Sequence, residues 1–363
     1  MLCSEILRSV SGKLQDEDEG ARRWPWESAS GAYSLMDSLN AAVREIVMQR
    51  PDATARTEPM RLEPGMMQRI PRADIHMTSR NAVSLINVIQ NLAPDGNTPG
   101  RPVFRVELDA LRAAMTPETI LVSVMFVNNE IGSVQPIEEI SKIVKMVNPQ
   151  ALLHVDAVQA YGKYRIYPKR MGIDMLSVSG HKIHGPKGSG FLYIDEKVKI
   201  RPLILGGGQQ NGMRSGTDNV PGIAGLAKSA EIVYKHFDEQ TAQMRACKHR
   251  LIEGLRELDD VVIHGMPEEE GAPQIVNASF LNVRSEVLLH TMEDRQIYVS
   301  AGSACSSHKR AGSPTLTAIG ASKAEMESAV RFSFSEFTTL EQIDYTLDTL
   351  REVLPMLRRF TRK

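Results

Sequence analysis

The stretch ILVSVMFVNNEIG at residues 120–132, with PIEEISKIVKMV at 136–147 and ALLHVDAV at 151–158, decides the fold class. The first of these segments opens with an apolar run rich in β-branched residues, and the last is also a short apolar run, as expected for buried strands. The middle segment has one apolar stripe at helical spacing, made of Ile137, Ile140, Val144 and Val147. The order strand, helix, strand predicts parallel pairing and an α/β domain.

Outward from this unit, two more apolar runs at 173–179 and 190–195 extend the series of strands. On the other side, residues 1–100 are uneven. Apolar residues between Leu35 and Val47 recur at helical spacing, and four prolines between Pro51 and Pro71 then interrupt regular structure. We therefore expect a helix and then irregular chain before the α/β core.

The pattern changes near residue 237. A long helix is predicted around 244–258, strands near 275–283 and 296–300, and a C-terminal helix in which Thr338 and Glu341 have capping-box spacing. We expect a large α/β domain over residues 1–237 with a mainly parallel central sheet, and a smaller α+β domain over 238–363.

Composition excludes several classes of partner. The 363 residues carry 43 Lys plus Arg and 44 Asp plus Glu, so the net charge of -1 gives no field that would attract nucleic acid or an anionic membrane. No segment approaches the ~20 apolar residues of a membrane span, and the first twenty residues become acidic. We expect a cytoplasmic protein without nucleic-acid or membrane partners.

Polar residues follow three of the predicted strands. Asn128, Asn129 and Glu130 end the first run, Asp156 leads to Gln159 after the second, and the third ends in Ser179-Gly180-His181-Lys182. Ligands of open parallel sheets bind beyond the carboxyl ends of the strands. The three groups together predict a site at this edge, although each alone is an ordinary loop start.

Lys182 is the strongest candidate at that edge. Glycines flank it in SGHKIHGPKG, and a desolvated lysine loses its proton readily enough to form a Schiff base. Asp156 could pair with the pyridine nitrogen of a pyridoxal cofactor. The alternatives are a solvated loop lysine and a carboxylate that caps a helix.

A phosphate could be held by GGGQQNGMRSGT at 206–217, which offers glycine amides, hydroxyls and Arg214. A nucleotide-binding P-loop in GHKIHGPKGS is disfavoured, because Pro186 occupies the position of that motif's lysine. His181 and His184 stand three apart without a third ligand at a recognisable spacing, so we predict no metal site.

The three cysteines, at positions 3, 247 and 305, are too few and too far apart for a disulfide framework or a zinc cluster. Cys247 lies on the apolar stripe of its predicted helix and is expected in the core. Cys305 lies among small and polar residues in VSAGSACSSHKRAGS, where Lys309 and Arg310 would favour a thiolate. We predict that Cys305 is a reactive thiol.

Taken together, VNNEIGSVQPI, HVDAVQAYGK, SVSGHKIHGPKGSGFLYI, GGGQQNGMRSGT, SAGSACSSHK and VRFSFSEFTT resemble the successive motifs of the cysteine desulfurases. The resemblance runs from about residue 108 to the C-terminus. It implies a fold-type-I pyridoxal 5'-phosphate enzyme, normally a homodimer. Such an enzyme converts L-cysteine to L-alanine and leaves sulfur as a persulfide on its own cysteine, for a sulfur-acceptor or scaffold protein of iron-sulfur cluster assembly or a thiolation pathway.

The resemblance also implies a role for each matching position. Lys182 would be the Schiff-base lysine and Cys305 the persulfide-bearing nucleophile. The remaining positions would bind cofactor or substrate: Asp156 the pyridine nitrogen, Gln159 the ring hydroxyl, Ser179 and His181 the phosphate, Thr217 the phosphate of the partner subunit, and Asn129 and Arg331 the substrate carboxylate.

Residues 1–100 depart from the family pattern. They contain neither its aspartate-bearing first strand with an Ala-Thr-Thr segment nor its Gly-Thr-Glu-Ser type loop, and Arg80 stands where the family has a histidine that stacks on the ring. Two readings follow: an active desulfurase with a rebuilt cofactor wall, or a non-catalytic relative that binds or regulates. A selenocysteine lyase is a third, and Cys305 argues against an aminotransferase.

Overall fold

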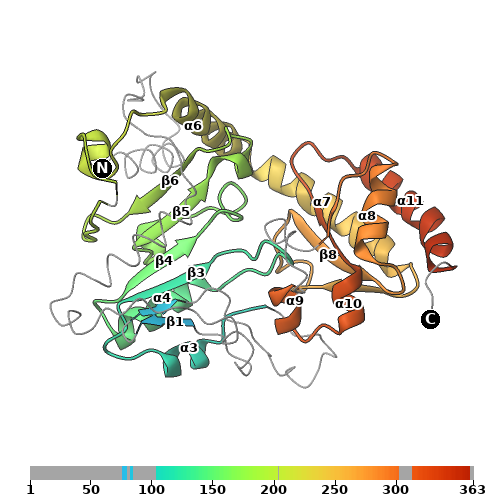
Figure 1. Ribbon diagram of the computed structural model, residues 1–363, viewed down its shortest axis with the longest axis horizontal. Helices are drawn as coiled ribbons and strands as arrows, with labels where there is room; N and C mark the ends of the chain where they lie inside the picture. Colours follow the sequence, from blue (N-terminus) through green and yellow to red (C-terminus); the bar gives the residue numbers. More distant parts are fainter. Residues whose placement is uncertain (1–75, 80–81, 85–103, 203, 302–312, 360–363) are drawn as a thin grey trace. The chain divides into compact units, whose positions relative to one another are not determined.

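In the computed structural model, the described residues are 76–79 and 82–84, for their backbone, and 104–202, 204–301 and 313–359 (Figure 1). The predicted helix between Leu35 and Val47, Arg80 and Cys305 lie outside them. The chain divides into two compact units. In the described residues, the first holds 108–126 and 137–236 with the short strands before them, and the second holds 104–107, 127–136 and everything from Phe237 onward.

The first unit is built on a four-stranded sheet in the order β3-β4-β5-β6. Its elements, with a separate antiparallel pair β1-β2, are β1 (His76–Ser79), β2 (Ala82–Ser84), α3 (Leu108–Ala114), β3 (Leu121–Met125), α4 (Ile137–Val147), β4 (Leu152–Asp156), α5 (Pro168–Met171), β5 (Met175–Ser179), η3 (Gly180–Ile183), β6 (Gly190–Ile194), η4 (Gln209–Gly212) and α6 (Val220–Lys235). The predicted strand-helix-strand unit at 120–158 is therefore confirmed.

Strands β3, β4 and β5 pair in parallel, as predicted, whereas β6 pairs antiparallel to β5, with Ser179 opposite Gly190. The reason is the length of the connection: the ten residues between Ser179 and Gly190 form a turn and are too few for the helical crossover that a parallel strand needs. The central sheet is mixed and mainly parallel, with its strands β3 to β5 buried along almost their whole length.

The second unit has an antiparallel sheet in the order β7-β8-β10-β9. Its elements are α7 (Phe237–Arg256), β7 (Val261–His264), β8 (Ile275–Phe280), α8 (Ser285–Glu293), β9 (Ser300–Ala301), α9 (Pro314–Ala318), α10 (Lys323–Ser328), β10 (Ala329–Ser333) and α11 (Leu340–Arg359). The strand predicted at 296–300 was wrong in extent, since only Ser300–Ala301 is strand.

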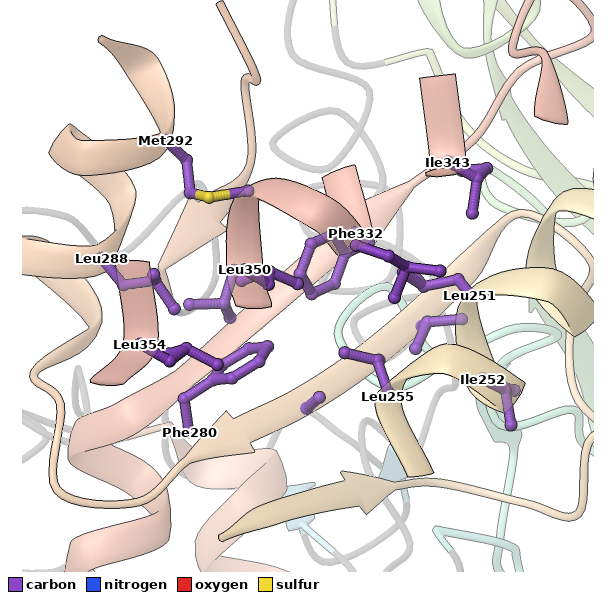
Figure 2. Packing of buried hydrophobic residues seen from close by; sticks show 14 of the residues in the cluster. Leu251, Ile252, Leu255, Phe280, Leu288, Met292, Phe332, Ile343, Leu350 and Leu354 are labelled. Atoms are coloured by element: carbon purple, nitrogen blue, oxygen red, sulfur yellow. The ribbon is translucent and has the colours of Figure 1, made fainter. Parts of the chain in front are cut away.

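The core of the second unit forms where α7, α8 and α11 bring apolar side chains onto the sheet (Figure 2). Phe280 of β8 and Phe332 of β10 meet edge to face with ring centroids 6.2 Å apart. Cys247 is fully buried in this core, as predicted, and its thiol donates to the carbonyl of Thr338 at 3.4 Å. Burial raises the pKa of this thiol, which disfavours the nucleophilic thiolate form of Cys247.

The capping box predicted at Thr338 and Glu341 is wrong by one residue. Thr339 and Gln342 exchange the two hydrogen bonds instead: the Thr339 amide donates to Gln342 Oε1 at 3.1 Å, and the Gln342 amide donates to Thr339 Oγ1 at 3.3 Å. Thr338 is occupied otherwise, because its hydroxyl oxygen accepts the amide of Ser335 at 3.1 Å. Two adjacent threonines made the two registers indistinguishable in the sequence.

Among the described residues, no helix is both long enough and apolar enough to cross a membrane.

Candidate active site

The site begins at the carboxyl ends of adjacent parallel strands in the first unit. Asp156 is the last residue of β4 and is paired with Met125 of β3 and Ser177 of β5. Its carbonyl accepts the amide of Phe126 at 2.9 Å. Ser179 ends β5, two residues beyond the Ser177 pairing, so both predicted side chains lie at one edge of the sheet.

Asp156 combines burial with a nearby donor. The Val158 amide donates to its Oδ1 at 2.9 Å, while desolvation, the larger effect, raises the pKa of the carboxyl. Part of the Asp156 surface is accessible, so a ligand can reach it. Because desolvation penalises the charged carboxylate, a nearby cationic partner would stabilise it. A protonated pyridine nitrogen is such a partner, so this position fits a pyridoxal ring.

Gln159 follows in a tight turn that Tyr161 anchors. The amide of Tyr161 donates to the carbonyl of Ala157 at 2.8 Å. The Tyr161 ring is almost fully buried and meets Phe191 and Tyr234 edge to face, with centroids 5.3 and 5.2 Å apart. This packing fixes the turn that carries the half-buried Gln159 one helical turn beyond Asp156.

Lys182 lies in the short turn η3 that directly follows β5. The turn is closed by hydrogen bonds from the Gly185 amide to the Gly180 carbonyl, at 2.9 Å, and from the Lys163 ammonium to the Lys182 carbonyl, at 2.7 Å. Ile183 is buried beneath it, whereas the Lys182 side chain is exposed. The backbone of Lys182 is held while its amine stays accessible to a ligand.

Glycine is required at the start of this turn. A Cβ on Gly180 would lie 2.6 Å from Ser189 Oγ and 3.0 Å from Leu226 of α6. The absence of a side chain lets the turn pack closely against α6. Gly180, one of the glycines that flank Lys182, therefore serves the close packing of the turn itself.

His181 is exposed beside Lys182, and its pKa is lowered by burial first and then by the charges of Lys182 and Lys187. A neutral imidazole can donate one N–H to a phosphate oxygen without adding charge. Thr217 is also exposed, on the segment that precedes α6, three residues before Val220. Within the first unit, the residues Asp156, Gln159, Ser179, His181 and Lys182 gather at one sheet edge.

The second unit brings two predicted substrate residues together. Arg331 of β10 donates from Nη1 to the backbone carbonyl of Asn129 at 2.8 Å, and from Nη2 to Ser300 Oγ at 3.3 Å. This contact uses the backbone carbonyl of Asn129, and the side-chain amide of Asn129 takes no part in it. Cys305 itself lies outside the described residues, in the segment 302–312 that follows β9.

Sequence reasoning assigned no role to two buried polar residues here. Glu130 is only 5% exposed, and its carboxylate accepts from the hydroxyls of Ser313 and Thr315 in the second unit. His154, fully buried in the first unit, joins Ser123 and Ser177 with hydrogen bonds of 2.7 and 2.8 Å. Its signal was present: His154 stands two residues before Asp156 and shares its face of β4.

A family model for class-V aminotransferases matches residues 98–346. The chain belongs to the class-V aminotransferase family. This is the family whose cofactor is pyridoxal phosphate, in agreement with the half-buried carboxyl at the end of β4 and the exposed lysine after β5.

Among curated relatives, the chain is 41% identical over 256 residues to the cysteine desulfurase IscS of Methanosarcina thermophila, covering 70% of this chain and 63% of that protein. It is 42% identical over 256 residues to IscS of Salmonella paratyphi C, covering 70% and 62%. For the mitochondrial cysteine desulfurase of Saccharomyces cerevisiae the identity is 40% over 258 residues, covering 70% and 51%. The chain thus matches less than two thirds of the length of these relatives.

Solved structures agree. A NifS-like protein superposes with a TM-score of 0.65 at 39% sequence identity, covering 70% of this chain and 66% of that one. A NifS-like protein from Rickettsia africae gives 0.61 at 30% identity, covering 69% and 67%. These matches confirm the predicted α/β, fold-type-I class.

Proposed function

We propose that this class-V aminotransferase family member is a pyridoxal-phosphate-dependent cysteine desulfurase. The observation that carries the proposal is the placement of the half-buried Asp156 carboxyl at the end of β4 and of the exposed Lys182 just after the neighbouring strand β5. Identities of about 40% to named cysteine desulfurases support the same activity.

The residues of the first unit would hold the cofactor. Asp156 would pair with the pyridine nitrogen, Gln159 with the ring hydroxyl, and Ser179 and His181 with the phosphate, to which a partner subunit would add its own Thr217. Bound pyridoxal phosphate would supply an electron sink next to the α-carbon of the substrate. Lys182, which would bind the cofactor covalently, would also take up and return protons at that carbon.

Asn129 and Arg331 would face the carboxylate of L-cysteine, because a guanidinium provides the paired donors that a carboxylate prefers. The Cys305 thiolate would then attack the substrate sulfur. A sulfur–sulfur bond forms as the carbon–sulfur bond breaks, and its electron pair remains with the three-carbon fragment, which takes up a proton to become L-alanine. The net change is enzyme thiol plus L-cysteine to enzyme persulfide plus L-alanine.

The proposal extends to the setting of the reaction. A homodimer and a sulfur-acceptor or scaffold protein, for iron-sulfur clusters or thiolation, are implied by the resemblance to the desulfurases. The activity is assigned to the cytoplasm, since persulfide chemistry needs a free thiol and a reducing compartment keeps thiols reduced.

The test uses the purified full chain with added pyridoxal phosphate. We expect visible absorption from lysine-bound cofactor, and sulfide and alanine after L-cysteine and a thiol reductant are added. Lys182→Ala should lose the absorption, while Cys305→Ala should keep it and lose sulfide release. Cys247→Ser is the matched control, because that buried cysteine should not matter to sulfide release.

Three outcomes would redirect the proposal. A protein that stays colourless with the cofactor would be a non-catalytic relative. Faster turnover of selenocysteine than of cysteine would make it a selenocysteine lyase. Sedimentation of the loaded protein as a monomer would contradict the homodimer.

A further inference from the structure

The segment that carries Cys305, residues 302–312, joins two described ends in the second unit: Ala301, the last residue of β9, and Ser313, which precedes α9. Both ends are tied to the same turn, residues 128–133. The residues that make these ties are distant in the sequence, so the arrangement is tertiary rather than local.

At the first end, β9 pairs with β10, with Ser300 opposite Arg331 and Ala301 opposite Val330. The guanidinium of Arg331 reinforces this two-residue strand. It donates to Ser300 Oγ at 3.3 Å and to the carbonyl of Asn129 at 2.8 Å. One side chain thus connects the start of the Cys305 segment to the 128–133 turn.

At the second end, the buried Glu130 carboxylate accepts a hydrogen bond from the Ser313 hydroxyl and another from the Thr315 hydroxyl, the latter at 3.3 Å. Ser313 Oγ also accepts the amide of Leu316 at 3.1 Å, which caps α9. The proton and a lone pair of this one hydroxyl are both engaged, so the side chain of Ser313 is fixed in a single orientation.

The turn itself is rigidly built. Asn128, 1% exposed, accepts the amides of Glu130 at 2.8 Å and Ile131 at 3.0 Å through its side-chain oxygen. The side-chain amide of Asn277 in β8 donates to the Glu130 carbonyl at 3.3 Å. At Gly132, with φ of +69°, an added Cβ would lie 3.1 Å from Ile275 Cβ. The turn is therefore seated on β8.

Helix capping alone does not account for Glu130. The neighbouring helix α10 has an ordinary capping box, in which Ser322 and the exposed Glu325 satisfy one another within four residues. Helix α9 also has a local cap in Ser313, but a buried carboxylate 183 positions away, that of Glu130, accepts the proton of this serine in addition. Burying a carboxylate is costly unless it is well hydrogen-bonded, so the local cap without Glu130 would have been the cheaper arrangement.

We propose that Glu130 is a positioning residue for Cys305: by holding Ser313 while Arg331 holds Ser300, the 128–133 turn sets the separation of the two ends of the Cys305 segment. The inference rests on the proposed function, because it concerns the step in which sulfur passes to Cys305. Arg331 takes part both in this anchor and, with Asn129, in the pair of residues proposed to face the substrate carboxylate.

The test compares Glu130→Gln with Ser322→Ala, the matched control that removes the cap of α10. In Glu130→Gln the amide nitrogen cannot accept a hydroxyl proton, so we expect formation of the Cys305 persulfide to slow about tenfold to a hundredfold, with the KM for L-cysteine within about twofold of the wild type. Ser322→Ala should change neither. If the two variants change the rate of persulfide formation and the KM for L-cysteine in the same way, Glu130 has only a structural role and the inference fails.

A second measurement does not depend on turnover. We expect alkylation of Cys305 by iodoacetamide, followed by mass spectrometry, to be at least about threefold faster in Glu130→Gln, with faster hydrogen exchange at residues 313–317. Unchanged rates would overturn the inference even if the enzyme were active. If the wild type makes no persulfide, the proposed function fails. The rates of Cys305 alkylation and of hydrogen exchange would then still decide whether Glu130 anchors the Cys305 segment. Should Glu130→Gln not fold, Ser313→Ala, which removes only a hydroxyl, is measured in its place.

Discussion

His154 and Asp156 lie two positions apart on β4, on the same face of the sheet, and burial shifts their pKa values in opposite directions. It lowers the pKa of His154 to about 3 and raises the pKa of Asp156. Both shifts favour the uncharged form, as desolvation must. The histidine is thereby kept neutral between Ser123 and Ser177, whereas a cationic partner would favour the charged form of the Asp156 carboxyl.

The first prediction concerns His154 and acid. An unfolded chain protonates this residue below its ordinary pKa of 6.5, and the folded protein does not until pH about 3. Stability should therefore fall as pH drops below 6.5, by about 1.4 kcal/mol per pH unit from this residue. In His154→Gln this contribution should vanish. Urea unfolding of both proteins at pH 7.5, 6.5 and 5.5 measures it, and parallel slopes would contradict the assignment.

The second prediction concerns Lys248, a lysine of α7 that is 5% exposed and donates to the carbonyls of Glu268 and Ala272, each at 3.1 Å. Desolvation lowers its pKa to about 8 from 10.5. Between these values the unfolded chain holds more protons than the folded protein, so stability should rise with pH. Relative to Lys248→Met, the wild type should gain up to about 3 kcal/mol between pH 8 and 10.5. Denaturant titrations of both proteins across this range test it, and a constant difference would refute it.

The third prediction concerns Asp156→Asn. The variant keeps the shape and the acceptor for the Val158 amide but cannot supply negative charge to a pyridine nitrogen. We expect the visible absorption of bound cofactor to persist and sulfide release to fall at least about a hundredfold. The cofactor dissociation constant and the turnover number should be measured together. Activity within tenfold of the wild type would remove Asp156 from its proposed role.

The fourth prediction concerns Gly162, which has a φ of +78°. A Cβ there would lie 2.6 Å from Val233 of α6 and 3.0 Å from Ile183, the residue after Lys182. Gly162→Ala should cost about 2–4 kcal/mol of unfolding free energy, from strain and overpacking. The control is Gly208→Ala, where no atom lies within 4 Å of the added Cβ and φ is -84°. Equal losses in thermal or chemical unfolding would contradict this account.

The sequence predicted most of the first unit because its strands and helices are local patterns. Apolar runs located β3, β4 and β5, and the residues at their ends located Asp156 and Lys182. It did not predict that β6 runs antiparallel, since direction depends on the length of the connection rather than on hydrophobicity. The capping box of α11 was predicted one residue too early. Thr338 and Thr339 are equivalent in the sequence, and only the hydrogen bond from the Ser335 amide to the Thr338 hydroxyl distinguishes them.

Long-range polar contacts were beyond reach for a different reason. The partners of the Glu130 carboxylate lie more than 180 positions away, and no local sequence pattern around residue 130 indicates them. The link between Arg331 and Asn129 spans 202 positions and uses a main-chain oxygen, which has no side-chain signature. The roles given to Gln159, Ser179, His181, Thr217 and Cys305 stay predictions, and Cys305→Ala tests the last of them.

The chain passes between the two units four times in the described residues, after Glu107, Phe126, Pro136 and His236. Because 127–136 supplies the turn seated on β8, a fragment beginning at Phe237 would lack a piece of its own architecture. Neither unit can be excised as one contiguous gene segment, and a single protease cut cannot release either from the chain. Recombination that exchanged only the C-terminal third would separate Glu130 from Ser313, so the two must be inherited together.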